Sequence, residues 1–421
     1  MFERTYRQRL EADLGRWETD GVITPAVVAG IRTALPPLAP SVSIPVVMGI
    51  LGGLLIAAAF LAFVAAHWVE VARLLRFAIL ATGIVVAHGL AASFARAGRP
   101  VLADLCASVG SIIFGAAIAL VGQMYHLGED FAGGMLLWAV GALIAAALTG
   151  SRGALAVALA AGTIWSAMRI YDAPELPHLP FVAFWFLAGS LALIWKSRVA
   201  AHLVALASLP WWIAVAFRLT MNNLDPLFVL ADGAALLLGG GLALAAAPWQ
   251  RAREVGAVLA TYGAFSLAIV TAFVVATYND PISSYTEAAS HPLWANACGI
   301  AGAVLAFAAA AMARRVGYAF AGSAVALVLL ARAFTWPQTG EPWLAYAVEL
   351  GAMLCLVISG MLDNVRSRII AGWIGIAGVI AGITWAVKGS LLRRSAFLAV
   401  AGVVAVGLAT VLNRLLSRTN E

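Results

Sequence analysis

Apolar spans of about twenty residues follow one another along almost the whole chain, with short polar gaps between them. The hydrocarbon core of a bilayer needs ~20 apolar residues per helix and offers no hydrogen-bond partner to an open backbone group. Hydrophobic residues make up 63% of the 421 residues and charged residues only 11%, against roughly 25% charged residues in a soluble domain. The sequence therefore predicts an all-α, polytopic membrane helix bundle.

The spans predict about fourteen transmembrane helices within residues 41–421, preceded by a separate segment at residues 1–40. The expected spans are 44–66, 74–94, 101–122, 132–149, 153–169, 180–195, 199–217, 227–247, 255–277, 293–312, 316–334, 343–362, 369–387 and 395–415. Because apolar periodicity locates helices better than their ends, each boundary is good to a few residues.

The basic residues fall mostly in every second gap, which orients the chain. With the N-terminus in the cytoplasm, 18 of the 26 Arg and Lys residues lie at the inner side. Positive charge is retained in cytoplasmic loops, so both termini are expected on the cytoplasmic side of the membrane. The basic loop from Lys388 to Arg394 falls outside in this scheme, which makes the span count least certain near the C-terminus.

The first forty residues predict a short cytoplasmic helical hairpin. Tyr6, Leu10 and Leu14 form one apolar stripe at helical spacing, and Asp20-Gly21 is a turn signal. Thr24 before Pro25 is typical of a helix start. Because acidic residues offset the arginines of this segment, it has no basic face for nucleic acid. Docking on the cytoplasmic loops or on a protein partner is the expected role.

Several stretches of the N-terminal part resemble a known family. They are Trp17 to Thr24 (WETDGVIT), Ala65 to Trp68 (AAHW), Phe114 to Gly128 (FGAAIALVGQMYHLG) and Trp138 to Gly141 (WAVG). This pattern, over roughly the first 170 residues, is similar to predicted bacterial inner-membrane proteins of a domain family of unknown function, DUF2157. The resemblance implies location and architecture, and it brings no activity and no site residues.

Two similar motifs end the first and third predicted spans at the outer side. His67 precedes Glu70, and His126 precedes Glu129 and Asp130. In a helix, residues three apart share a face, so each motif presents an imidazole beside a carboxylate. Three interpretations stay open for this outer cluster: a divalent cation site, a proton or substrate contact, and structural hydrogen bonding.

Other polar residues lie inside or at the ends of the spans. Gln123 and Tyr125 lie one turn from the outer cluster, where a buried amide must bond a neighbouring helix or line a wet cavity. Asp232 and Glu349 lie about five residues in from the outer ends of their helices, and Arg332 is close to the outer end of its span. We expect Glu349 to pair with Arg332, either as a staple or within an outward-facing polar vestibule.

Glycines within the spans predict close helix packing, as in the Gly49-x-x-x-Gly53 and Gly378-x-x-x-Gly382 patterns. The run Gly239-Gly240-Gly241 allows a second interpretation, a broken helix of the kind that transporters use at binding sites.

Motifs for cofactors, metals and catalysis are missing from the sequence. There is no phosphate-binding loop, no HExxH and no GxSxG motif. Cys106, Cys298 and Cys355 are far apart and inside spans, which indicates neither a disulfide framework nor a thiolate metal site. We therefore assign no catalytic residue, no metal and no cofactor.

Three classes of function remain. The first is a transporter-like or permease-like protein whose substrate, a small molecule or a lipid, is unknown, with the candidate pathway residues His67, Glu70, Gln123, Tyr125, His126, Glu129, Asp130, Asp232, Arg332 and Glu349. The second is a membrane-embedded enzyme at the periplasmic face. The third is a non-catalytic membrane scaffold or sensor that acts through the hairpin. The lipid bilayer is the surrounding partner in all three.

Overall fold

The computed structural model describes residues 2–34, 72–125, 130–172, 178–220, 226–277, 293–334 and 343–386, with a few isolated positions between 48 and 62. Every element in these ranges is an α-helix. The chain divides into two compact units, residues 1–63 and 64–421, which are described separately.

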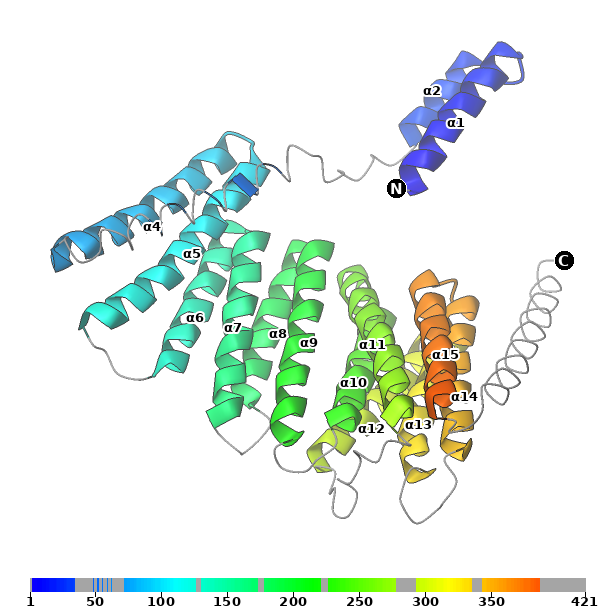
Figure 1. Ribbon diagram of the computed structural model, residues 1–421. Coiled ribbons are helices and arrows are strands. Elements are labelled where there is room, and N and C mark those ends of the chain that lie inside the picture. The colour runs from blue at the N-terminus through cyan, green and yellow to red at the C-terminus, as the bar shows by residue number, and fades with distance from the viewer. Residues whose placement is uncertain are drawn as a thin grey trace. The chain divides into compact units, whose positions relative to one another are not determined.

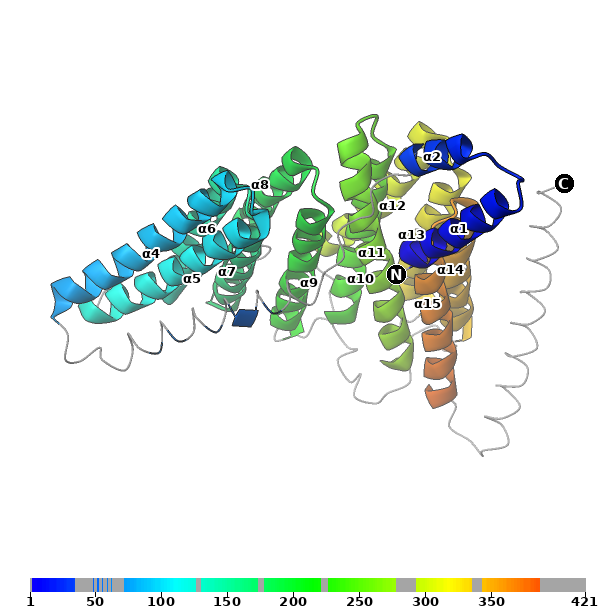
Figure 2. The same cartoon turned by 90° about the horizontal axis from the view of Figure 1, so that it is seen from above.

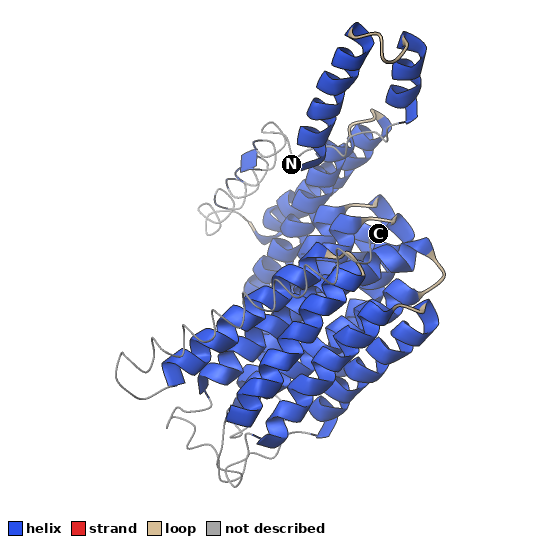
Figure 3. Cartoon of the chain, turned by 90° about the vertical axis from the view of Figure 1, so that its right-hand side faces the viewer, coloured by secondary structure: helices blue, strands red, loops and turns tan. Residues whose placement is uncertain are grey.

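The first unit contains two helices, α1 (Phe2–Thr19) and α2 (Pro25–Ala34), joined by a tight turn (Figure 3). Gly21 takes a left-handed φ of 71°, and the Val22 N–H donates to the Trp17 carbonyl, which closes the end of α1. Leu14 and Val28 are buried. The guanidinium of Arg32 binds Glu11 of the other helix at 2.9 and 3.1 Å. The hairpin's cytoplasmic location stays a prediction.

The second unit is a bundle in which consecutive helices run antiparallel (Figure 1). The described helices are α4 (Arg73–Arg96), α5 (Pro100–Tyr125), α6 (Phe131–Thr149), α7 (Arg152–Asp172), α8 (Leu179–Trp195), α9 (Arg198–Thr220), α10 (Pro226–Ala246), α11 (Gln250–Thr277), α12 (Leu293–Ala313), α13 (Val316–Phe334), α14 (Trp343–Leu362) and α15 (Arg366–Ala386).

These helices coincide with the second to thirteenth predicted spans. In the described part of the chain, ten are long and apolar enough to cross a membrane, and α8 and α13 are shorter apolar helices. The first and last predicted spans, 44–66 and 395–415, fall on residues that are not described apart from the isolated positions. A multi-pass helical membrane protein is thus confirmed, and the count of fourteen spans stays a prediction.

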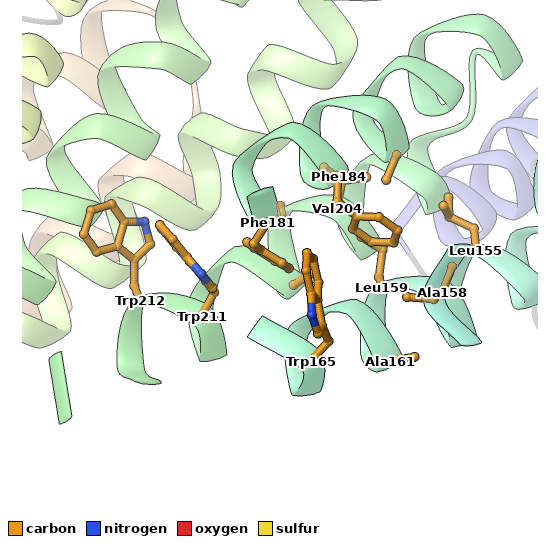
Figure 4. Close-up of a cluster of buried hydrophobic side chains, with 14 of the residues drawn as sticks. Leu155, Ala158, Leu159, Ala161, Trp165, Phe181, Phe184, Val204, Trp211 and Trp212 are labelled. Carbon is orange, nitrogen blue, oxygen red and sulfur yellow. The ribbon is translucent and has the colours of Figure 1, made fainter. Parts of the chain in front are cut away.

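Two apolar cores hold the bundle together. The first is rich in aromatic side chains from α7, α8 and α9, among them Trp165, Phe181 and Trp211 (Figure 4). The second lies among α10 to α15 (Figure 2) and consists largely of small residues and leucines. Large apolar side chains such as Leu148 and Phe217 are 82% and 72% exposed. Exposed side chains of this kind suit helices whose outer faces contact lipid.

The small residues of α10 bring neighbouring helices into backbone contact. A Cβ on Gly239 would collide with the backbone of Gly302 on α12, and one on Gly241 would collide with the backbone of α11 at Ala260. Helix α10 is continuous through this glycine run. The close-packing interpretation of Gly239-Gly240-Gly241 is therefore confirmed, and the broken-helix interpretation is wrong.

The bundle has two ends, which we name after the predicted orientation of the chain. The predicted outer end is where α10, α12 and α14 begin and α7, α9 and α13 end. The predicted inner end is where α9, α11, α13 and α15 begin. The assignment of these ends to the two sides of a membrane rests on the arginine bias alone.

Candidate functional site

A charged pair is buried between membrane helices at the predicted outer end. The guanidinium of Arg332 on α13 lies 2.8 and 3.1 Å from the two carboxylate oxygens of Asp232 on α10. The Asp232 side chain is 1% exposed and that of Arg332 is 11% exposed. Because α10 begins at Pro226, Asp232 lies about 9 Å along the helix at 1.5 Å per residue. The pair therefore lies inside the span.

Three further contacts make Arg332 the centre of a three-helix cluster. Its guanidinium donates to the Oδ1 of Asn296 on α12 at 3.3 Å and to the Phe228 carbonyl on α10 at 3.0 Å. The same guanidinium lies over the Phe228 ring, 5.1 Å from its centroid. One cation is thus held by a carboxylate, an amide, a backbone carbonyl and an aromatic face, which together replace the water that it loses.

Small residues create the room for this cluster. A Cβ on Gly299 would collide with the Oδ1 of Asp232, so glycine lets α12 approach the carboxylate directly. Gly233, next to Asp232, lies against the indole of Trp212 in the same way. The two glycines therefore let neighbouring groups pack closely around Asp232, which is enclosed.

Glu349 is a second carboxylate buried at the predicted outer end. It lies on α14, which packs along α13, and it is 1% exposed. The contact that we expected between Glu349 and Arg332 stays a prediction. The carboxylate seen on Arg332 is Asp232, which sequence reasoning did not pair with it. The only signal in the sequence was that Asp232 and Arg332 both lie near the outer ends of their spans.

Most of the outer cluster at the first and third spans is not described. His67, Glu70, His126 and Glu129 lie outside the described residues. Tyr125 is the last residue of α5, and Gln123 is exposed near the end of the same helix. Whether the two histidines converge on one cleft stays a prediction.

Asp130, the described acidic residue of that cluster, fixes the start of α6. Its carboxylate accepts from the Gly133 N–H at 2.9 Å, which makes it the N-cap, and both of its oxygens lie 2.9 Å from Arg169 of α7. The Gly133 hydrogen bond, followed by Arg169, lowers the pKa of Asp130 below its usual value. Asp130 therefore has a structural role, whatever else it does.

A polar network that sequence reasoning missed lies next to Arg169. His178, just before α8, shares a 2.8 Å hydrogen bond between its Nδ1 and the Oγ of Ser166 on α7. The indole N–H of Trp211 on α9 donates to the same Oγ at 3.0 Å. Trp165 packs edge-on against the imidazole, with ring centroids 4.7 Å apart (Figure 4 labels Trp165 and Trp211). Burial first, and then the positive charge of Arg169, lower the pKa of His178.

A second buried ion pair closes the predicted inner end. Arg368 of α15 lies 2.7 Å from Asp363 in the turn after α14, and their side chains are 4% and 5% exposed. Arg368 also donates to the Ser359 Oγ at 2.6 Å and lies over the Tyr318 ring. Arg368 lies in the first turn of α15, and Asp363 lies in the connection just before it. The pair therefore fixes the α14–α15 connection.

Metal binding has no support among the described residues. No group of three or more His, Cys, Asp or Glu side chains comes together there in a way that would hold an ion. Cys106, Cys298 and Cys355 are free thiols.

One comparison with known proteins gives a match. Residues 15–155 match the model of a family described as a predicted membrane protein (DUF2157), which confirms the resemblance seen in the first 170 residues. No curated protein and no solved structure matches the chain. The matched segment ends in α7, so the Asp232–Arg332 cluster lies beyond it.

Proposed function

We propose that this multi-pass membrane protein is transporter-like or permease-like, acts in the inner membrane of a bacterium, and moves a small molecule or a lipid not yet identified. The observation that supports the proposal is the Asp232–Arg332–Asn296 cluster within apolar helices. Ionisable residues inside membrane spans are rare, and they commonly mark substrate or ion pathways.

Energetics favour a functional role for this pair over a purely structural one. Removing two charges from water costs several kcal/mol per ion, and their attraction roughly repays that cost. Well-packed apolar residues of similar volume are often as stabilising as a buried pair, or more so. Apolar residues could therefore join α10 to α13 as well as Asp232 and Arg332 do. The pair has a function if a substrate or a proton neutralises the charge of Asp232 or Arg332 during transport.

The proposed pathway begins at the predicted outer end, where the Asp232–Arg332 pair lies. Asp232, Arg332 and Glu349 would supply its described charges, and Asn296 a neutral donor and acceptor. The outer histidine and carboxylate residues at the first and third spans remain candidates for its mouth. Such a site would bind a substrate that carries a charge or a transferable proton.

Cys298 provides a native reporter for the experiment. In the sequence, Cys298 lies between Asn296, which binds Arg332, and Gly299, which packs against Asp232. In a variant with Cys106→Ala and Cys355→Ala, a membrane-impermeant thiol reagent is added to either side of proteoliposomes. A transporter that alternates between two open states should be labelled at Cys298 from both sides, at different rates.

A matched control separates aqueous access from general reactivity. Ala297 precedes Cys298 and is exposed on α12, so we expect it to face lipid. An Ala297→Cys variant that also carries Cys298→Ala should resist the impermeant reagent from either side while reacting with a lipid-soluble maleimide. Labelling of Cys298 from one side only, or from neither, contradicts the transporter proposal.

A further inference from the structure

A pocket of about 690 Å³ opens at the predicted inner end, far along the helices from the Asp232–Arg332 cluster. Two turns form it: the α8–α9 turn at Lys196 and Ser197, and the α10–α11 turn around Trp249. Ligand pockets commonly measure roughly 300–1,000 Å³. The pocket is therefore large enough for a small molecule or a lipid headgroup.

The pocket carries an excess of positive charge. Lys196, Arg198 and Arg251 line it, with Glu254 as its one acidic residue. Arg198 lies 3.6 Å from Glu254, and its side chain is 76% exposed, so this ion pair is weak. Lys196 and Arg251 form no ion pair with any residue in the described ranges. Two cations are thus available to a ligand.

Hydrogen bonds hold the backbone of both turns in place, which fixes where the cationic residues begin. Lys196 ends α8 in a left-handed conformation with φ 51°, and its N–H is bonded to carbonyls of the last turn. Ser197 is buried, and its Oγ accepts from the Ala200 N–H at 3.3 Å, which caps α9. In the other turn, Arg253 donates to the carbonyls of Ala247 and Pro248 at 2.9 and 3.0 Å. Arg253 is therefore occupied by the turn itself.

Exposed apolar side chains form part of the rim of the pocket. Trp249 is 75% exposed and Ile194 is 62% exposed, and both line the pocket. Ile194 continues an exposed apolar face of α8 that includes Phe186 and Leu187. Tryptophan collects at the level of lipid headgroups, where its ring is half in lipid and half in water. The cations lie beside a surface suited to acyl chains.

We propose that this pocket binds the phosphate headgroup of an anionic phospholipid. The phosphate would lie between Lys196 and Arg251, with Arg198 free to leave Glu254 and join them, and the acyl chains would run along the exposed face of α8. Basic pockets between membrane helices bind lipid headgroups in this manner. The apolar rim favours a lipid over a water-soluble phosphate. The inference is independent of the transporter proposal, because a scaffold or an enzyme would use such a lipid equally well.

Native mass spectrometry of the full-length protein in detergent tests the site. The probes are phosphatidylglycerol, zwitterionic phosphatidylcholine and water-soluble glycerol 3-phosphate. The wild-type protein should retain phosphatidylglycerol in preference to phosphatidylcholine. Each cation removed should weaken phosphatidylglycerol binding about fivefold, so Lys196→Gly with Arg251→Gln should lose about 25-fold.

The variants are chosen to keep the fold. Glycine adopts the left-handed conformation of residue 196 without strain, so Lys196→Gly removes the charge and preserves the turn. Arg152→Gln is the matched control, because Arg152 is the exposed first residue of α7 at the same end but does not line the pocket. Its lipid binding should equal that of the wild type.

Three results would overturn the proposal. One is unchanged phosphatidylglycerol binding in the double variant with an unchanged melting temperature. Another is equal retention of phosphatidylglycerol and phosphatidylcholine by the wild type. The third is displacement of the lipid by glycerol 3-phosphate at comparable concentration, which would assign the pocket to a soluble phosphate compound.

Discussion

The guanidinium of Arg332 lies 2.8 Å from the carboxylate of Asp232, although the two residues are 100 positions apart in the chain. Their contact joins α13 to α10 inside the bundle, and the Asn296 side chain of α12 completes the enclosure. If one member of the pair is removed, the charge of the other is left in a site with little access to water. The consequences of this enclosure are measurable.

Removal of either charge alone should destabilise the protein more than removal of both. Asp232→Ala removes the carboxylate that faces the guanidinium of Arg332 in a low-dielectric site, and the loss expected for breaking a buried pair is about 3 kcal/mol. The double variant with Arg332→Ala removes both members of the pair and should recover part of that loss. Unfolding of the detergent-solubilised protein measures the four states of the cycle. Additive losses would contradict the coupling.

His178 should make stability fall as the pH drops below about 6.5. Its folded-state pKa is lowered by burial and by Arg169, so the folded protein resists a proton that the unfolded chain accepts near pH 6.5. The contribution is therefore complete above pH 6.5 and is lost as the pH falls toward the lowered pKa. The measurement is the difference in unfolding free energy between the wild type and His178→Gln, in which other titrations cancel.

That difference should favour the wild type most above pH 6.5 and shrink on acidification. Glutamine does not titrate, yet it still offers a polar group to Ser166. A difference that is constant, or that grows in acid, would show that His178 is not kept neutral by its surroundings.

Local features of the fold could be predicted from the sequence, whereas the pairing between distant helices could not. The apolar runs place α4 to α15, and the Asp20-Gly21 signal places the turn between α1 and α2, because these depend on neighbouring residues. The partner of Arg332 depends on which helices pack together. Proximity in the sequence favoured Glu349, across a short connection, over Asp232.

The pocket at the predicted inner end was missed for a similar reason. Basic residues near the ends of membrane helices indicate orientation. Lys196, Arg198 and Arg251 were interpreted in that way alone. Two turns separated by more than fifty residues must meet before their charges form a pocket. Trp249, exposed between Pro248 and Gln250, was the one unusual signal at that point.

Cysteine labelling should establish the orientation that the arginine bias predicts. In a variant without native cysteines, Ala97→Cys and Arg314→Cys lie in exposed turns at the predicted inner end. Asp172→Cys lies exposed at the opposite end of α7. An impermeant reagent added outside intact cells should label residue 172 alone. Labelling of residue 97 or 314 from outside would reverse the orientation.

Two adjacent glycines of α10, Gly239 and Gly240, allow a test of how closely this helix packs against α12. Gly239→Ala places a methyl group against the backbone of Gly302 on α12, where neither backbone can move without separating the helices. The expected cost of such overpacking is about 1–3 kcal/mol. In contrast, a Cβ on Gly240 meets no atom within 4 Å. Gly240→Ala should therefore be neutral or stabilise α10 by up to about 1 kcal/mol, since alanine favours helix over glycine.

Thermal unfolding of the two single variants in the same detergent separates these effects. Both changes add one methyl group to the same helix, so differences in composition or helix propensity cancel. A melting temperature that falls for Gly239→Ala and holds or rises for Gly240→Ala supports direct contact between the α10 and α12 backbones. Equal responses would mean that the two helices do not approach each other closely at Gly302, and that the glycines of α10 are not there to bring helices together.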